Sequence, residues 1–195
     1  SCGIAEARRI WNDSDMVAES LCVACLFEGE VALRHRLDLA DMFGARTLVL
    51  ITGGFEDLAA TGYSGGIEHA RSLLIDRFGA AAELAADHRV RLAFEPLHPM
   101  VCGFRSVVSS LGEALDILDQ LDDGHDIGLA IDAYALWWEH DLQAKLMRAG
   151  DRILNYHVSD WLSDTRDLRL DRGMPGDGQI ALRDWRRTVS YTHLR

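Results

Sequence analysis

The 195-residue sequence has no long apolar run, and no stretch approaches the roughly 20 apolar residues that a helix needs to cross a bilayer. It also lacks an excess of positive charge, because 20 Lys and Arg stand against 31 Asp and Glu, for a formal net charge of −11. A general nucleic-acid binder is disfavoured, since contacts to phosphates need a positive field. With 48% hydrophobic and 26% charged residues, a long disordered chain is excluded as well. We therefore expect neither a membrane nor a nucleic-acid partner.

Cysteine is scarce, at four residues: Cys2, Cys22, Cys25 and Cys102. Cys22 and Cys25 form a C-x-x-C, a pattern found in redox centres and in half of a zinc site. The pair lies inside the apolar run 21–27, which is typical of a buried strand, whereas a redox pair normally opens a helix. No second C-x-x-C completes a zinc site, so we interpret the pair as buried structure. No signal peptide is visible, and we expect a reducing cytoplasmic location.

Apolar runs of strand length alternate with longer amphipathic stretches. The pattern predicts strands over 21–27, 46–52, 90–95, 126–132 and 152–158, and helices over 5–20, 29–43, 67–88, 109–121 and 140–149. Gly44 is the expected C-cap of the second helix, and Ser109 or Ser110 the expected N-cap of the fourth. Apolar strands separated by helices indicate an α/β fold with a parallel sheet.

Two α/β architectures fit this order, a doubly wound open sheet and a closed (β/α)8 TIM barrel. Neither G-x-G-x-x-G nor G-x-x-x-x-G-K-[ST] follows the first strand, which weakens the nucleotide-binding doubly wound folds. A complete barrel runs to about 250 residues, and this sequence shows about five strands and starts on a helix. We therefore expect a TIM barrel that is incomplete at both ends.

Three consecutive predicted strands end on a side chain that can bind a metal. Glu95 ends the third strand, Asp132 the fourth and His157 the fifth. The carboxyl ends of parallel strands form the active-site face of α/β folds, so these three groups should share one rim. Each alone is better explained by helix capping or a structural hydrogen bond, but three in a row favour a shared site. Two carboxylates and an imidazole suit Mn²⁺, Mg²⁺, Co²⁺, Fe²⁺ or Zn²⁺.

For several other residues, the sequence leaves open whether they belong to this site. His98, three residues after Glu95, either faces the same mouth or is simply solvated. Trp137 and its neighbour Trp138 either wall a pocket or pack the top of the barrel. The Gly-rich segment 171–178 exposes backbone N–H groups suited to an oxyanion or a hydroxyl-rich ligand, although alone it is merely a turn.

Four stretches resemble, in order and spacing, the sugar phosphate isomerase/epimerase family of xylose-isomerase-like TIM barrels. They are Phe-Glu-Pro-Leu-His-Pro at 94–99, Ile-Asp-Ala-Tyr-Ala-Leu-Trp-Trp at 131–138, Tyr-His-Val-Ser-Asp-Trp at 156–161 and Asp-Arg-Gly-Met-Pro-Gly-Asp-Gly at 171–178. The agreement extends from about residue 5 to residue 189.

The resemblance implies that Glu95, Asp132 and His157 are three of four ligands to one divalent cation, with Glu95 doubling as a proton-transferring base. It also implies that Arg172 holds a substrate hydroxyl or phosphate. His98 and Trp137, from their positions in the sequence, are further candidate substrate contacts. Asp160 would lie beside the ligands without touching the metal. Family members commonly carry a His where this sequence has Ala135, which leaves the identity of the substrate open.

The implied activity is metal-dependent isomerisation or epimerisation of a sugar, with or without a phosphate, by proton transfer next to a carbonyl through an enediolate. Alternatives are an inosose-dehydratase-like lyase on the same scaffold, a diverged sugar-binding protein and an inactive fragment. A homo-oligomer is compatible with all of them. The family's fourth ligand, a Glu on the eighth strand, has no counterpart here. We expect 1–189 to be a partial barrel, 190–195 a non-native tail, and the chain by itself to be inactive.

Overall fold

The computed structural model describes residues 3–121 and 126–192 of the chain, so Cys2 and residues 193–195 lie outside the described part. Its strands are β1 (Ser20–Cys25), β2 (Thr47–Ile51), β3 (Arg91–Phe94), β4 (Ile127–Asp132), β5 (Ile153–His157), β6 (Asp160–Trp161) and β7 (Arg172–Gly173). Its α-helices are α1 (Ile4–Asn12), α2 (Glu30–Met42), α3 (Phe55–Ala59), α4 (Ile67–Ser72), α5 (Leu74–Ala86), α6 (Leu111–Leu118), α7 (Ala133–Leu136), α8 (Leu142–Ala149) and α9 (Leu182–Thr192). Three 3-10 turns occupy Leu26–Glu28, Pro99–Val101 and Gly150–Arg152.

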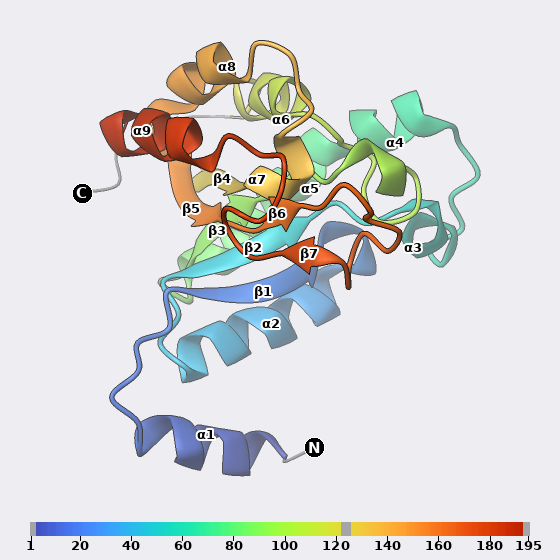
Figure 1. The fold of residues 1–195 in the computed structure, drawn as a ribbon. Coiled ribbons are helices and arrows are strands. Elements are labelled where there is room, and N and C mark those ends of the chain that lie inside the picture. The colour runs from blue at the N-terminus through green and yellow to red at the C-terminus, as the bar shows by residue number, and fades with distance from the viewer. Residues whose placement is uncertain (1–2, 122–125, 193–195) are drawn as a thin grey trace.

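The main sheet contains β1 to β5, all parallel, in the spatial order β1-β2-β3-β4-β5 (Figure 1). A doubly wound sheet would reverse its direction of growth at one point, whereas here each strand adds on the same side of the preceding one. This is the strand order of an α/β barrel, in which strands consecutive in sequence are neighbours in space. The prediction of a partial α/β barrel is therefore confirmed.

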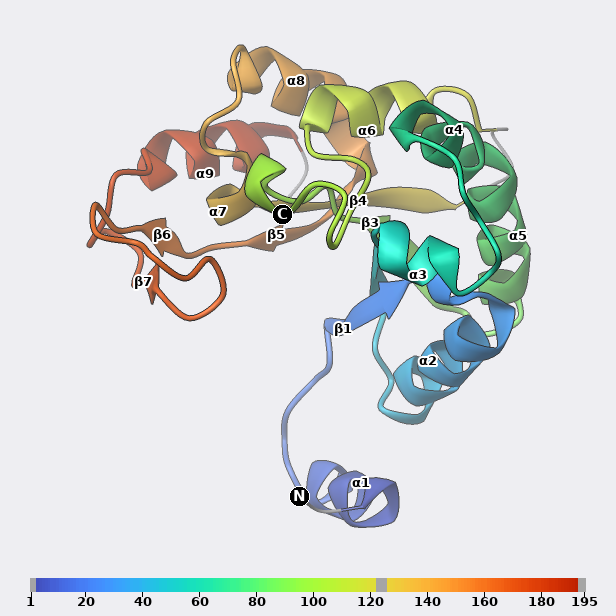
Figure 2. The ribbon, with the colours of Figure 1, turned by 90° about the vertical axis from the view of Figure 1, so that its right-hand side faces the viewer.

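Helices α2, α5, α6 and α8 lie along the outer side of the sheet and bury its apolar side chains (Figure 2). Helix α2 packs on β1 and β2, α5 packs on β3, and α6 packs against α8. Leu48, Leu50, Leu92 and Phe94 from neighbouring strands are fully buried in this outer core. In the described part of the chain, no helix has the length and apolar character that a membrane crossing requires.

The inner side of the sheet is lined by small residues and is curved. Val49, Ala93 and Ala130 form a separate buried cluster there. The Thr47 hydroxyl on β2 donates a hydrogen bond of 2.8 Å to Asn155 Oδ1 on β5, although two strands separate them in the sheet. Only a strongly curved sheet brings these strands within reach, so the inner side is the concave interior of a barrel segment.

Several expected boundaries differ from the structure, including those of three helices. The predicted helix over 5–20 ends at Asn12, and the chain then leads into β1 at Ser20. The predicted helix over 67–88 is two helices that meet at Leu73. The last helix runs to Thr192, past the boundary expected at Val189, and the non-native origin of 190–195 stays a prediction.

The expectation that both cysteines of the C-x-x-C are buried is wrong for one of them. Cys25 is buried, but Cys22 is exposed. The reason is that β1 forms an edge of the sheet, with β2 on one side only. The apolar composition of residues 21–27 predicted a buried strand, but the position of β1 at the edge of the sheet leaves Cys22 exposed.

Candidate functional site

The three predicted metal-binding side chains lie at the carboxyl ends of adjacent strands. Glu95 directly follows β3, and its backbone N–H donates to Leu50 O at 3.0 Å, which continues the pairing with β2. Asp132 ends β4 and His157 ends β5, and the two residues are register partners. Each stands two positions beyond an inward-facing residue (Ala93, Ala130 or Asn155), so all three belong to the concave face.

Glu95 and His157 contact each other directly. The His157 Nδ1 and Glu95 Oε1 atoms are 3.2 Å apart, and the two side chains are 29% and 12% exposed. Hydrogen bonding by Cys22 and by Glu95 raises the pKa of His157 to about 10. The imidazole is therefore protonated at neutral pH and neutralises the Glu95 carboxylate. Cys22 thus belongs to the surroundings of this site, which its place in an apolar run did not indicate.

Asp132 is held by other partners. Its side chain is 3% exposed, and Oδ1 accepts the Tyr134 N–H at 3.0 Å while Oδ2 accepts Arg172 Nη1 at 2.8 Å. Arg172 also lies over the Tyr134 ring, with its guanidinium carbon 4.4 Å from the centroid, and contacts Ser159 Oγ at 3.4 Å. The residue expected to hold substrate therefore forms an ion pair with an expected metal ligand.

The donor set fits a divalent cation in its chemistry, since the concave face offers two carboxylates and an imidazole in one place. The ligand atoms of the three residues are more widely spaced than those of a closed metal centre. In the described residues, Glu95, Asp132 and His157 are not a group whose ligand atoms all lie within 4.8 Å of one another. In addition, the ion pair to Arg172 occupies the Asp132 oxygen that does not accept the Tyr134 N–H.

Five aromatic side chains form a shelf beside these residues: His98, Tyr134, Trp137, Trp138 and Trp161. The His98 ring stacks on Trp161 at 5.0 Å and 21°, and Trp137 and Tyr134 contact the same indole at 5.4 and 4.9 Å. Burial lowers the pKa of His98, and its Nδ1 accepts the Met100 N–H. The indole N–H of Trp137 is buried and has no hydrogen-bond partner in the described structure. Both predicted substrate contacts, His98 and Trp137, therefore belong to the shelf.

Asp160 organises the Gly-rich loop and does not contact the three candidate ligands in any hydrogen bond of the described residues. Its carboxylate accepts the N–H groups of Trp161, Gly176 and Ile180 at 2.9, 2.9 and 3.0 Å. Burial by itself would raise the pKa of Asp160, but these backbone donors outweigh it and hold the pKa below the ordinary value of 3.8. The side chain thus fixes the hairpin of β6 and β7, which carries Arg172.

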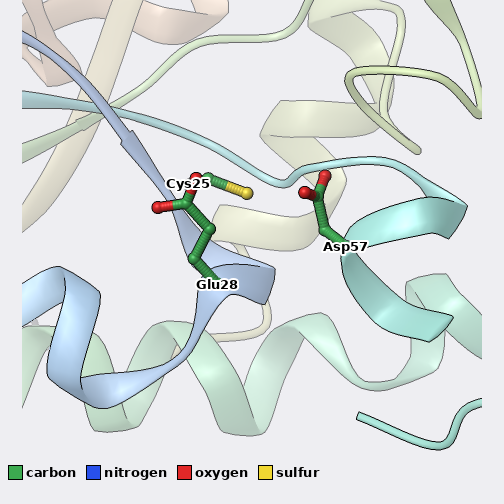
Figure 3. Close-up of side chains that lie close together, drawn as sticks. All are labelled: Cys25, Glu28 and Asp57. Atoms are coloured by element: carbon green, nitrogen blue, oxygen red, sulfur yellow. The ribbon is translucent and has the colours of Figure 1, made fainter. Parts of the chain in front are cut away.

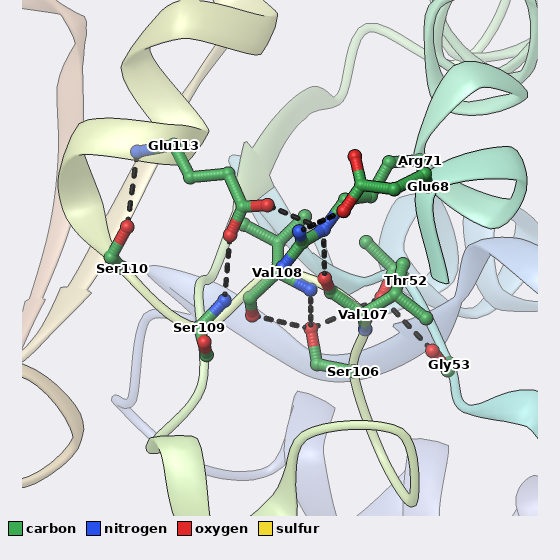
Figure 4. A network of polar contacts seen from close by, with 10 residues as sticks. All are labelled: Thr52, Gly53, Glu68, Arg71, Ser106, Val107, Val108, Ser109, Ser110 and Glu113. Atoms are coloured by element: carbon green, nitrogen blue, oxygen red, sulfur yellow. Dashed lines mark hydrogen bonds and ion pairs between the residues drawn. The ribbon is translucent and has the colours of Figure 1, made fainter. Parts of the chain in front are cut away.

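The loop after β3, which begins at Glu95, is anchored to the neighbouring strand by a buried polar network (Figure 4). Thr52, directly after β2, accepts the Val107 N–H at 2.9 Å and lies 3.1 Å from Ser106 Oγ. Arg71 of α4 donates to Val107 O at 2.9 Å and pairs with Glu113. Arg71 thus connects α4 to the segment after β3, while α5 packs on the sheet.

A second cluster stands at the ends of β1 and β2 and consists of Cys25, Glu28 and Asp57 (Figure 3). The thiol and one oxygen of each carboxylate lie within 4.8 Å of one another. Burial raises the pKa of the Cys25 thiol to about 11, and Asp57 already accepts the Gly54 N–H at 2.8 Å. Cys25 and Glu28 are three residues apart, but Asp57 comes from helix α3 beyond β2, so no sequence signal joined the three.

Taken together, a parallel sheet curved like a barrel wall and acidic and imidazole groups at its strand ends define an α/β-barrel protein with a candidate site at the carboxyl face. The family described as "Xylose isomerase-like TIM barrel" matches residues 31–192, and the chain belongs to this family. The resemblance drawn from the four sequence stretches is thereby confirmed.

Solved structures agree with this assignment. Protein SMc04130 from Sinorhizobium meliloti 1021 is 37% identical, with a TM-score of 0.85 over 98% of this chain and 71% of its own. The IOLI protein with a bound zinc atom is 16% identical, with a TM-score of 0.76 over 100% of this chain and 70% of its own. The 3-keto-D-glucoside 4-epimerase YcjR from E. coli is 15% identical, with a TM-score of 0.74 over 98% and 74%. No protein with a curated functional description matches the chain.

Proposed function

We propose that this chain belongs to a divalent-metal-dependent isomerase or epimerase that acts on a sugar or sugar phosphate by proton transfer next to a carbonyl. The observation that carries the proposal is the placement of Glu95, Asp132 and His157 on three adjacent strand ends of one concave face. Two structures of the same fold, one with zinc bound and one an epimerase, support it. A small sugar or polyol is the partner we infer, and a cytoplasmic location stays a prediction.

The residues have separate roles in this proposal. Glu95, Asp132 and His157 would hold one divalent cation, which when bound lowers the pKa of a C–H beside a carbonyl. Glu95 would move the proton, because a carboxylate at the rim can reach a carbon placed over the site. The aromatic shelf would exclude water from one side. Arg172 would donate to a substrate hydroxyl or phosphate oxygen.

Replacing the proton-transferring carboxylate tests the proposal. In the protein made from the complete gene and loaded with Mn²⁺, Glu95→Gln should slow exchange of substrate C–H for deuterium by about 100-fold or more, since general-base catalysis contributes about that much. Exchange is followed by NMR in D₂O with a panel of ketoses and ketose phosphates.

The matched control is Glu83→Gln, which makes the same change on an exposed position of helix α5. It should leave exchange unaltered. Exchange at the wild-type rate in Glu95→Gln would remove Glu95 from the mechanism.

A further inference from the structure

Each candidate carboxylate at the site contacts a side chain of the same chain. Glu95 Oε1 lies 3.2 Å from His157 Nδ1, and Asp132 forms an ion pair with Arg172. Asp132 is the more buried of the two carboxylates, and both of its oxygens accept a hydrogen bond. A carboxylate this deeply buried needs a compensating positive charge, and here a side chain of the same chain supplies it.

The exposure and backbone position of Arg172 allow its guanidinium to contact the Asp132 carboxylate and also to move away from it. Its side chain is 42% exposed, while that of Asp132 is only 3% exposed. The backbone of Arg172 belongs to the β6–β7 hairpin, opposite Trp161, and Asp160 fixes that hairpin through three backbone N–H groups. The guanidinium can therefore swing into solvent without movement of the hairpin that carries it.

We propose that the Arg172 guanidinium and a divalent cation compete for the same oxygen, Oδ2 of Asp132. This inference rests on the proposed function, since it takes Asp132 to be a ligand. Arg172 compensates the charge of Asp132 while no cation is bound, and binding of the cation displaces the guanidinium toward the mouth of the barrel. There its donors face the space in which a substrate oxygen would lie. A single side chain thus couples occupation of the cation site to presentation of a substrate-binding group.

If Arg172 competes with the cation, removing it should change the cation affinity in the opposite direction from that expected if Arg172 only supports Asp132. Removing a competitor tightens cation binding, whereas removing a group that merely orients Asp132 weakens it. Arg172→Met removes the charge and keeps an unbranched stem that can pack on the Tyr134 ring. Arg172→Lys keeps a charge but loses the fixed planar fork, so its effect should be intermediate.

The experiment is a titration of the protein made from the complete gene with Mn²⁺ alone, in which free Mn²⁺ is measured by its EPR signal. Arg172→Met should bind Mn²⁺ at least about tenfold more tightly than the wild type, a factor typical of one charge-assisted hydrogen bond. The matched control is Arg169→Met, which makes the same change of net charge at an exposed position of the same hairpin loop and should alter the dissociation constant little. Circular dichroism checks that each variant folds.

Failure of this inference can be told apart from failure of the proposed function. If Asp132→Asn abolishes Mn²⁺ binding but Arg172→Met leaves it equal or weaker, the cation site stands and the competition is wrong. If neither the wild type nor Arg172→Met binds Mn²⁺, both proposals fall. Binding by Arg172→Met together with weak or absent binding by the wild type supports the competition, and Arg172→Lys provides the same comparison should the Met variant not fold.

Discussion

At the scale of single residues, the buried carboxylate of Asp160 has a structural role beside the candidate active site. Asp160 has no exposed surface and yet no cation as partner in the described ion pairs. Its charge is stabilised by backbone N–H groups of its own hairpin and loop, which point at it as they would at a bound anion. The resemblance placed Asp160 near the metal, and the structure shows it holding the loop that carries Arg172.

Replacing this carboxylate should loosen the hairpin in a pH-dependent way. Asp160→Asn should lower the free energy of unfolding by about 1–3 kcal/mol at neutral pH, because an amide cannot accept from all three donors. The folded pKa of Asp160 is depressed, so its stabilisation is present above the ordinary value of 3.8 and is lost as pH falls through the lower folded value. Urea denaturation between pH 3 and 7 would measure the difference, which should shrink at the acid end.

Asp177→Asn is the matched control, because Asp177 is exposed in the same loop. The same loss of stability in both variants, or a difference that grows toward low pH, would contradict this account of Asp160.

At the scale of elements, helix α6 is held at its N-terminus by a carboxylate from far along the chain. The buried Glu139 accepts the N–H groups of Leu111 and Gly112 at 2.7 and 3.1 Å and pairs with Lys145 at 2.6 Å. The first turn of a helix has unpaired N–H groups and a partial positive charge, and Glu139 satisfies both needs. Ser110, one of the two expected N-caps, also caps this helix through its own side chain.

Glu139→Gln should destabilise the fold by about 3 kcal/mol, because it leaves the Lys145 ammonium without its buried partner and supplies one acceptor for two donors. Thermal and urea denaturation would measure the loss. Lys145→Met should cost clearly less when made in the Glu139→Gln background than in the wild type. Equal costs in the two backgrounds would mean that the two side chains are not coupled.

At the scale of the whole molecule, the strand order and the curvature together make the site. Neighbours in sequence are neighbours in the sheet, so three consecutive strand ends bring their polar groups to one place. The hydrogen bond between Thr47 and Asn155 connects strands that are not adjacent and holds the curve. A flat sheet would carry the same residues at its edge, but their side chains would diverge.

Helix α1 contributes little to the packing of the barrel segment. It lies apart from the rest of the molecule (Figures 1 and 2), and none of its residues is buried. Its described ring contact is an edge-on approach of Trp11 to Phe43, at 6.0 Å between centroids. Deleting residues 1–12 should therefore change the free energy of unfolding by no more than about 1 kcal/mol.

Urea denaturation of the shortened chain measures this change. Trp11→Ala, which removes only that ring contact, should reproduce it. A loss above about 2 kcal/mol on deletion, with no effect of Trp11→Ala, would show that α1 stabilises the body by other contacts.

The sequence by itself determined the α/β class, the five strands, and the residues at three strand ends. It could do so because a strand buried by helices has to be apolar, which makes a polar residue at its end conspicuous, as at Glu95, Asp132 and His157. Local capping chemistry determined the start of α6 at Ser110 in the same way. These features depend on the chain's own neighbours in sequence.

Only the tertiary structure decided which groups meet. The pairing of Asp132 with Arg172, the approach of Cys22 to His157, and the cluster of Cys25, Glu28 and Asp57 all join segments whose spacing carries no signal. Edge position exposed Cys22 despite its apolar run, because burial depends on which strand lies alongside. The physical reason is common to all these cases: contacts between distant segments are set by the curvature and packing of the sheet, and hydrophobic pattern specifies only which side of each element is covered.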